Sequence, residues 1–251
     1  MMISIKTSEE IDKMLIPSQL VAKMHRELGQ FLKPGVTTMD VEHFVKKFAE
    51  RSGAQCAQIG YLDYPYATCS SVNDCIAHGF PDHTPLKDGD VVTIDTVFDV
   101  AGWKGDSAWT YCIGRTTPQT DHLVYVAKQC LLKGLEQVKP GNYTGDIAYA
   151  IQTYAESFGY GVVEDLLSHG IGREIHEEPF YPHVGQPGTG TELTPGMVLT
   201  VEPMINEGTP LFFIDEDGWS ARTLDGLNSA QFEHTVAITD QGLRILTDQE
   251  S

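Results

Sequence analysis

The sequence lacks several features that would each indicate a special class of protein. Its five cysteines are odd in number and include no C-x-x-C pair, which argues against a disulfide framework or a zinc knuckle. No apolar run approaches the roughly 20 residues that span a bilayer, and no basic segment followed by an apolar one opens the chain. We therefore expect reduced thiols, no membrane partner and a cytoplasmic location.

Positive charge is also scarce. The chain of 251 residues has 17 Lys and Arg against 35 Asp and Glu, which gives a formal net charge of −18. Nucleic-acid binding depends on Lys and Arg side chains that neutralise phosphates, so this balance argues against a nucleic-acid partner. A chain of this length can bury a sizeable core without disulfides, and we expect it to act as a monomer.

An internal repeat is the most informative pattern in the chain. Residues 33–53 align without gaps on residues 139–159, 106 positions later, and eight aligned positions are identical. Both copies show the i, i+3, i+4, i+7 apolar spacing of an amphipathic helix and end at a glycine. A further helical stretch precedes each copy, at about 8–32 and about 118–138, and Pro17 should kink or divide the first one.

A second repeated block places a carboxylate at the end of a strand in each copy. Residues 86–95 match residues 193–202 at an offset of 107, and both have the pattern of a turn followed by a strand. The two strands end in Asp95 and Glu202. Because the two offsets are almost equal, chance similarity is a poor explanation, and a duplication explains both blocks.

The repeats predict an α+β fold made of two pseudo-symmetric halves, about 8–115 and about 116–248. Their antiparallel sheets should be joined and covered by helices. No linker rich in Ser, Gly or Pro separates the halves, so we expect residues 1–251 to form a single catalytic domain.

Four carboxylates are predicted to converge where the halves meet. Asp95 and Asp106 flank a segment with a turn signal at its centre, so in a hairpin they should lie opposite one another on the same face. Glu202 is the repeat counterpart of Asp95, and Glu233 lies on the next strand-like run. The pseudo-two-fold should therefore bring all four side chains together.

Buried carboxylates repel one another and must be neutralised by cations or protons, and divalent metal is the natural solution. Two metals about 3.5–4 Å apart form a common centre for amide hydrolysis. Three histidines with glycine or acidic neighbours, His78, His169 and His176, add imidazoles to the set. Oxygen-rich ligands with some imidazole suit manganese, iron, cobalt or zinc, and the residues do not choose among them.

Eight short motifs occur in order along nearly the whole chain. They are N-D-C-I-A-H-G (73–79), T-I-D-T (93–96), G-D-S (105–107), S-H-G-I-G (168–172), I-H-E-E-P (175–179), V-E-P-M (201–204), D-G-W (217–219) and S-A-Q-F-E-H-T (229–235). This set resembles the type I methionine aminopeptidases of the M24 metallopeptidases. That family has a duplicated "pita-bread" fold, which agrees with the repeat.

The resemblance implies a dinuclear metal centre. By position, Asp95 chelates one metal, Asp106 and Glu233 bridge both, and His169 and Glu202 ligate the second. It also implies three catalytic residues: His78 near the scissile amide nitrogen, His176 near the carbonyl oxygen, and Glu202 as a proton relay.

The resemblance further implies an apolar pocket for a methionine side chain and a monovalent-cation site. The substrate-binding residues would be His78, His176, Tyr61, Tyr64, Cys69, Ile175 and Trp219. The cation site would lie near Asn73, Cys75 and Ser229. Three positions depart from the family: Ser168 replaces Gly, Ile175 replaces an aromatic residue and Gln58 replaces Cys. These departures leave the metal ligands unchanged and affect the shape of the pocket, so they bear on substrate preference.

These expectations combine into one function: metal-dependent removal of the N-terminal methionine from nascent proteins and peptides, preferentially when the second residue is small. Nascent chain N-termini, and with them the ribosome, are the expected partners. One alternative is a proline-specific peptidase of the same fold, which commonly has a histidine where Asp165 stands. Another is a catalytically silent adaptor, which typically loses metal ligands.

Overall fold

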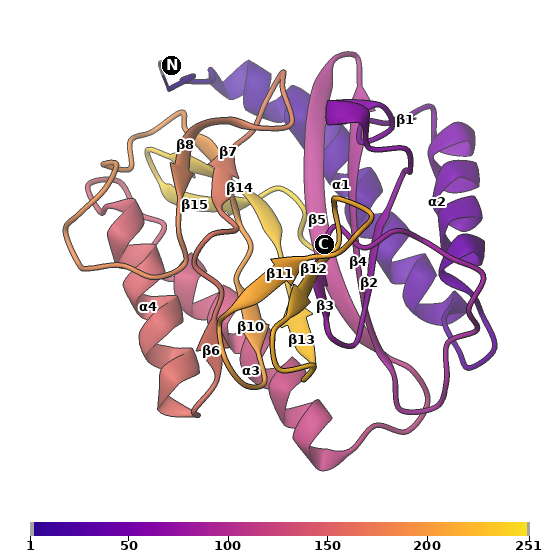
Figure 1. Cartoon of the computed structure of the whole chain (residues 1–251). Coiled ribbons are helices and arrows are strands. Elements are labelled where there is room, and N and C mark those ends of the chain that lie inside the picture. Colours follow the sequence, from indigo (N-terminus) through magenta and orange to yellow (C-terminus); the bar gives the residue numbers. More distant parts are fainter. Residues whose placement is uncertain (1–2, 250–251) are drawn as a thin grey trace.

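The structure is a computed structural model that describes residues 3–249, and its elements are arranged as two similar halves (Figure 1). The helices are α1 (Ser8–Phe31), α2 (Thr38–Ser52), η1 (Tyr61–Asp63), α3 (Pro118–Leu135) and α4 (Thr144–Ser157). The strands before residue 115 are β1 (Gln55–Cys56), β2 (Cys69–Val72), β3 (Cys75–Ala77), β4 (Val91–Val100) and β5 (Trp103–Cys112). The later strands are β6 (Gly161–Val162), β7 (Ser168–Gly170), β8 (Glu177–Tyr181), β9 (Val198–Val201), β10 (Met204–Asn206), β11 (Phe212–Ile214), β12 (Ala221–Thr223), β13 (Ser229–Gln231), β14 (His234–Thr239) and β15 (Gly242–Ile245).

The repeated helices α2 and α4 begin at equivalent positions for the same local reason. At the start of α2, the Asp40 carboxylate accepts the Thr37 N–H at 2.9 Å, and at the start of α4 the Asp146 carboxylate accepts the Tyr143 N–H at 2.7 Å. Each bond satisfies a backbone donor that the helix leaves unpaired. Gly53 ends α2 in the left-handed conformation, with φ 71°.

Pro17 was expected to kink or divide α1; the helix runs without a break from Ser8 to Phe31, so a division is wrong. A proline removes one helical hydrogen bond, but tertiary packing can outweigh that loss. Here the packing is close, because a Cβ added at Gly105 of β5 would lie 2.5 Å from the backbone nitrogen of Ser18. The glycine therefore allows α1 to lie directly on β5.

Two main antiparallel sheets form the centre of the molecule. The first has the order β1-β4-β2, with β5 also paired to β4, and the second has the order β15-β14-β9-β7-β8. Two three-stranded sheets, β13-β10-β6 and β11-β12-β3, complete the structure. The two repeated strands β4 and β9 thus each lie inside a main sheet. Glu202 directly follows β9 as expected, but β4 continues past Asp95 to Val100, so the expected strand end at Asp95 is wrong.

The register of the β4–β5 hairpin corrects one expectation. Asp95 pairs with Ala108, and Val97 pairs with Asp106, so the two aspartates are diagonal neighbours and not directly opposite. The turn lies at Ala101-Gly102, where the turn signal is, and a two-residue turn there pairs Val100 with Trp103, so the residue opposite Asp95 is two positions beyond Asp106. A shift of two keeps both carboxylates on one face, so the predicted convergence survives.

The halves meet along β5 and the segment that enters β14. Glu233 donates its N–H to the Ala108 carbonyl at 2.8 Å, and Asp106 donates its N–H to the Thr235 hydroxyl at 3.1 Å. The Thr235 hydroxyl in turn donates to the Asp106 carbonyl at 2.8 Å. One backbone bond and two bonds to the Thr235 hydroxyl therefore fix Asp106 and Glu233 beside one another at the junction.

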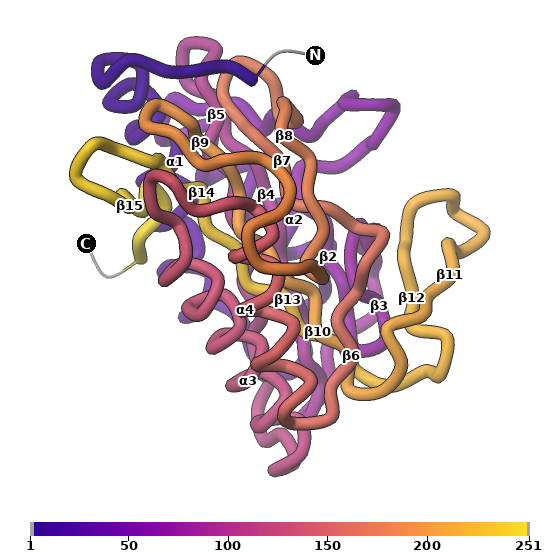
Figure 2. The backbone as a smooth tube through the Cα atoms, turned by 90° about the vertical axis from the view of Figure 1, so that its left-hand side faces the viewer, coloured from indigo at the N-terminus to yellow at the C-terminus, as the bar shows by residue number. Residues whose placement is uncertain are grey.

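Each half has its own apolar core between its helices and its sheet. Phe48 of α2 and Phe98 of β4 stack in the first core, with ring centroids 6.0 Å apart. Ile151 of α4 and Val201 of β9 belong to the second. Figures 1 and 2 show α1 and α3 behind the sheets, with the β11–β12 hairpin on the opposite side. Among residues 3–249, no helix combines the length and the apolar character needed to cross a membrane.

Candidate active site

The predicted carboxylates come together in a buried cluster at the junction of the halves. Asp106, Glu202 and Glu233 are 5%, 7% and 1% exposed. One ligand atom each from Asp106, His169 and Glu233 lie within 4.8 Å of one another. Asp95 lines the same cavity, and its carboxyl group interacts directly with that of Asp106.

The electrostatics of this cluster are those of a site that needs cations. Burial raises the pKa of Asp95 to about 7 and that of Glu202 to about 8, and it holds the pKa of Asp106 and Glu233 well above their usual range. One buried oxygen each of Asp95, Asp106 and Glu233 accepts no hydrogen bond within residues 3–249. Unpaired buried acceptors are costly, so the residues present fit divalent metal ions.

His169 presents a free imidazole nitrogen to the carboxylates. Its Nδ1 lies 2.9 Å from the Gly170 carbonyl, to which it donates, so Nε2 has the lone pair. Nε2 is 3.5 Å from Glu202 Oε1 and 3.9 Å from Asp106 Oδ2. Burial lowers the pKa of His169 to about 3, which keeps the ring neutral. This is the protonation state in which histidine binds metals.

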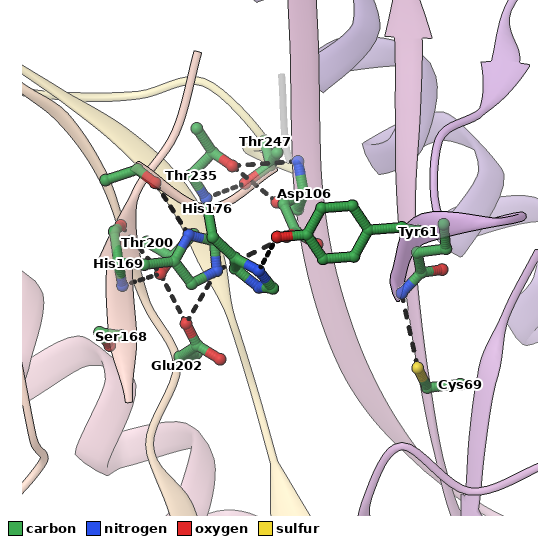
Figure 3. Close-up of polar contacts among 12 residues, drawn as sticks. Tyr61, Cys69, Asp106, Ser168, His169, His176, Thr200, Glu202, Thr235 and Thr247 are labelled. Carbon is green, nitrogen blue, oxygen red and sulfur yellow. Dashed lines mark hydrogen bonds and ion pairs between the residues drawn. The ribbon is translucent and has the colours of Figure 1, made fainter. Parts of the chain in front are cut away.

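Thr200 links the backbone of His169 to the carboxylate of Glu202 (Figure 3). Its hydroxyl accepts the N–H of His169 at 3.0 Å and donates to Glu202 Oε1 at 2.6 Å. Ser168, one of the departures from the family, is fully buried and hydrogen-bonds His183 Nε2 at 2.9 Å. The serine hydroxyl is therefore satisfied by a partner other than His169.

His176 faces the cluster from the loop that follows β7. Its ring stands nearly perpendicular to that of His169, with centroids 4.3 Å apart, and its Nδ1 lies 2.7 Å from the Tyr61 hydroxyl. Burial lowers the pKa of His176 to about 4, and burial raises the pKa of Tyr61. A neutral ring and a protonated phenol can form this bond in either direction, and Nε2 of His176 has the hydrogen in the tautomer in which Tyr61 donates.

His78 lies in a strained turn beside the cavity. Its φ is 58°, a left-handed value that costs energy in a non-glycine residue and is typical of functional sites. The next residue must be glycine, since a Cβ at Gly79 would lie 2.6 Å from the Ser70 carbonyl oxygen. The His78 ring is 6.1 Å from that of Trp219, and burial lowers its pKa.

A cavity of about 280 Å³ unites these groups. Every site residue predicted for metal binding, catalysis or the methionine pocket lines it: Asp95, Asp106, His169, Glu202, Glu233, His78, His176, Tyr61, Tyr64, Cys69, Ile175 and Trp219. Tyr64, Cys69 and Ile175 are each under 5% exposed, as expected for the inner wall of an apolar pocket.

Sequence reasoning missed several lining residues: Leu62, Val97, Asp165, Leu166, Leu167, Phe180 and Met204. Val97 and Met204 each lie two positions after a predicted ligand, so the period-two alternation of strands could have found them. The residues from loops or sheet edges belong to no repeated block and gave no signal. Leu62 and Phe180 are 69% and 46% exposed, so they form the rim of the cavity.

Gln58 was singled out as a departure and also lines the cavity. Its Nε2 donates to Cys69 Sγ at 3.5 Å, and its buried Oε1 has no hydrogen-bond partner in the described part of the chain. An unpaired amide oxygen in an apolar wall is a polar feature that a methionine side chain cannot satisfy, because a thioether has no donor.

Known proteins share this sequence pattern over the whole chain. The profile described as "Metallopeptidase family M24" matches residues 12–240. The chain is 43% identical to methionine aminopeptidase A of Synechocystis sp., covering 98% of this chain and 97% of the relative. It is 41% identical to methionine aminopeptidase 1 of Bacillus subtilis, covering 98% and 99%.

Solved structures of other proteins superpose closely on this chain. The crystal structure of methionine aminopeptidase from Rickettsia prowazekii superposes with a TM-score of 0.97 at 40% identity and covers 98% of this chain and 100% of that one. Prolidase from Pyrococcus furiosus superposes with a TM-score of 0.80 at 24% identity, and this chain covers 66% of it, a likeness that shows the fold alone. The pita-bread fold expected from the motifs is confirmed.

Proposed function

The chain belongs to metallopeptidase family M24, and we propose that the cavity at the junction of its halves is where it removes methionine from peptide N-termini. Its full-length relatives are methionine aminopeptidases, so the protein is a metal-dependent aminopeptidase that releases N-terminal methionine. The observation that carries the site assignment is the buried cluster of Asp106, His169 and Glu233, whose ligand atoms lie within 4.8 Å.

Five side chains would hold two divalent ions: Asp95, Asp106, His169, Glu202 and Glu233. Asp106 and Glu233 would be shared by both ions, in line with their central place in the cluster and their unpaired oxygens. Manganese, iron, cobalt and zinc all suit this donor set. When bound, such ions polarise a carbonyl and lower the pKa of water near them.

Side chains of the protein would stabilise the developing charge and transfer the proton. His176 would donate its Nε2–H to the scissile carbonyl oxygen, where negative charge develops in the transition state. His78 would contact the amide nitrogen from the other side of the cavity. Glu202, which accepts the Thr200 hydroxyl on one oxygen, would take up and return the proton.

The apolar wall would select the first residue. Tyr61, Tyr64, Cys69, Ile175 and Trp219 line the same cavity as the carboxylates, and a methionine side chain suits such a surface. The confined volume of about 280 Å³ supports a preference for a small second residue.

Neither alternative gains support from an observation. A proline-specific peptidase shares the fold, but Asp165 stands where those enzymes commonly have a histidine. A silent adaptor would be expected to lose metal ligands, whereas all five donors line the cavity.

The proposal extends to features that lie outside the cavity. A monovalent cation would bind near Asn73, Cys75 and Ser229, and the Asn73 carbonyl accepts the Ser229 N–H at 2.9 Å, which brings these segments together. Residues 1–251 would form one catalytic domain that acts as a cytoplasmic monomer on nascent chains, with the ribosome as partner. The net charge of −18 supports the absence of a nucleic-acid partner.

One assay tests the function. The metal-loaded protein is offered Met-Ala-Ser, an Xaa-Pro peptide and N-acetylated Met-Ala-Ser, with each of the four metals in turn. Release of methionine from the first peptide alone is expected. Cleavage before proline would instead favour the proline-specific alternative, and no cleavage with any metal would refute the proposal.

A further inference from the structure

The loop 172–177 is tied to the N-terminal segment by a buried ion pair. Lys6 Nζ lies 2.6 Å from Glu177 Oε2, and the two side chains are only 2% and 13% exposed. Neither residue lines the cavity, yet Glu177 directly follows His176. The pair therefore connects a segment outside the site to a residue inside it.

Glu177 uses both carboxylate oxygens. Oε1 accepts the N–H of Arg173 at 2.8 Å and that of Glu174 at 3.2 Å, while Oε2 accepts Lys6. Burial raises the pKa of Glu177, but Lys6 and the two N–H groups lower it more, so the pKa lies below its usual range. The ionised side chain thus folds the loop on itself and needs Lys6 as its cation.

Lys6 is held closely on both sides. Its own N–H donates to the Gly196 carbonyl at 2.7 Å. A Cβ added at Gly172 would lie 2.6 Å from Lys6 Cε and 2.8 Å from Glu177 Oε1, so a larger residue there would displace the two side chains of the pair. The lysine side chain is therefore confined to one path between its backbone and the carboxylate.

The two ends of the loop have separate anchors. Near its start, Lys104 donates its N–H to the Gly172 carbonyl at 3.0 Å, and the Arg173 guanidinium lies 3.7 Å from the centroid of the Trp103 ring. Near its end, the backbone of Glu177 pairs with Gly170 as β8 begins, and the Glu177 side chain is held by Lys6. Loss of the lysine would remove the side-chain part of this anchor, directly beside the residue that bears the imidazole.

We propose that Lys6 is a positioning residue for His176: by neutralising and anchoring Glu177, it holds the loop so that the imidazole meets the Tyr61 hydroxyl and directs Nε2 into the cavity. An unpaired buried carboxylate is strongly unfavourable, so without Lys6 the loop would rearrange to expose Glu177 to water. The kinetic part of the inference rests on the proposed function, whereas the structural part does not.

The kinetic experiment compares Lys6→Met with a matched surface variant, Lys13→Met. Lys13 Nζ lies 2.8 Å from Glu9 Oε1, but those side chains are 48% and 81% exposed. With Met-Ala-Ser, kcat should fall roughly tenfold or more in Lys6→Met, because small displacements of a catalytic group have large effects on rate. The KM and the metal content should stay unchanged, and Lys13→Met should match the wild type.

The double variant Lys6→Met/Glu177→Gln separates positioning from simple destabilisation. The amide oxygen of the introduced glutamine can still accept the two loop N–H groups, and no buried charge is left, so most of kcat should return. Equal loss in the single and double variants would overturn the inference. So would loss of metal together with the rate, or a wild-type rate in Lys6→Met.

A second readout needs no activity. The imidazole NMR signals of His176, assigned by comparison with His176→Ala, should shift in Lys6→Met and return in the double variant, while those of His122 stay constant. Unshifted His176 signals in Lys6→Met would overturn the inference. A wild type that released no methionine would refute the proposed function, but it would leave this NMR test valid. If Lys6→Met failed to fold, Lys6→Gln, which also leaves the Glu177 carboxylate without a cation, should show the same shift.

Discussion

The Tyr61 hydroxyl lies 2.7 Å from Nδ1 of His176, and this hydrogen bond crosses from the first half of the chain to the second (Figure 3). Because burial lowers the pKa of His176 to about 4, the ring is neutral and has a single N–H. In the tautomer that the proposed function requires, the phenol donates to Nδ1 and the ring hydrogen lies on Nε2, the nitrogen proposed to face the substrate carbonyl. In this arrangement Tyr61 selects the tautomer.

Tyr61→Phe should therefore lower kcat for Met-Ala-Ser by about tenfold with a small change in KM, because the apolar ring remains but the tautomer is no longer selected. Steady-state kinetics on the two proteins check this. Tyr125→Phe, which removes the hydroxyl of an exposed tyrosine outside the cavity, is the control. A Tyr61→Phe variant as fast as the wild type would contradict the assignment.

His78→Ala should retain the metals and lose rate. His78 lines the cavity but is not among the grouped donor atoms, so metal content measured by elemental analysis should be unchanged. General acid–base groups typically contribute about 10²- to 10⁴-fold, and a loss of kcat in this range is expected. An emptied metal site in His78→Ala would show that the division between ligands and catalytic residues is wrong.

Asp106→Asn and Glu233→Gln should abolish both metal binding and turnover, because each removes a charge at the centre of the donor cluster. Calorimetric titration with Mn²⁺ or Co²⁺ measures the first effect, and methionine release the second. Asp12→Asn, at a surface carboxylate that is 63% exposed, should change neither. Full metal binding by either cluster variant would exclude the proposed bridging role.

The stability of the metal-free protein should fall as the pH rises from about 7 to about 8.5. Burial raises the folded pKa of Asp95 to about 7 and that of Glu202 to about 8, so the folded chain binds protons that the unfolded chain releases, and this stabilisation is lost with increasing pH. The buried histidines do not interfere, because above pH 7 they are largely neutral in both states.

Thermal unfolding with a chelator present should therefore show a Tm that drops by roughly 5 °C per pH unit across this range. Saturating Mn²⁺ should flatten the slope, since the cation replaces the protons. A Tm that rises with pH in the metal-free protein would mean that the carboxylates are paired in a way the structure does not show.

Gln58→Leu should stabilise the protein and improve methionine binding. The substitution removes a buried amide oxygen that has no partner among residues 3–249, a group that costs about 1–3 kcal/mol when unsatisfied. The KM for Met-Ala-Ser should decrease, while any cleavage of peptides that begin with a donor side chain, such as Gln, should weaken. Unchanged selectivity would show that Gln58 lies outside the part of the cavity that contacts the first residue.

The sequence was sufficient for the features that depend on local pattern or duplication. The helix that begins at Thr38 recurs at Thr144, and all five predicted ligands line one cavity. One error came from a tertiary effect, since packing against Gly105 carries α1 through Pro17. Another was local, since the two-residue turn at Ala101-Gly102 sets a register that pairs Asp95 with Ala108.

Neither local patterns nor the duplication could predict the contacts between segments that are distant in the sequence. Lys6 and Glu177 are 171 positions apart, and Tyr61 and His176 are 115 apart, so no spacing rule connects them. Their pairing depends on how the loops fold back over the sheets. The rim residue Phe180 escaped notice for a related reason, since an exposed aromatic on a short edge strand has no periodic signature.

The seam between β5 and the start of β14 divides the donors unequally: Asp95 and Asp106 come from one side, and His169, Glu202 and Glu233 from the other. A gene cut in the connection between β5 and α3 would yield two fragments, each with an incomplete set of ligands. Methionine release would then require the two fragments to reassociate. If each fragment were fused to a different protein, methionine release would report that the two fused proteins lie close together.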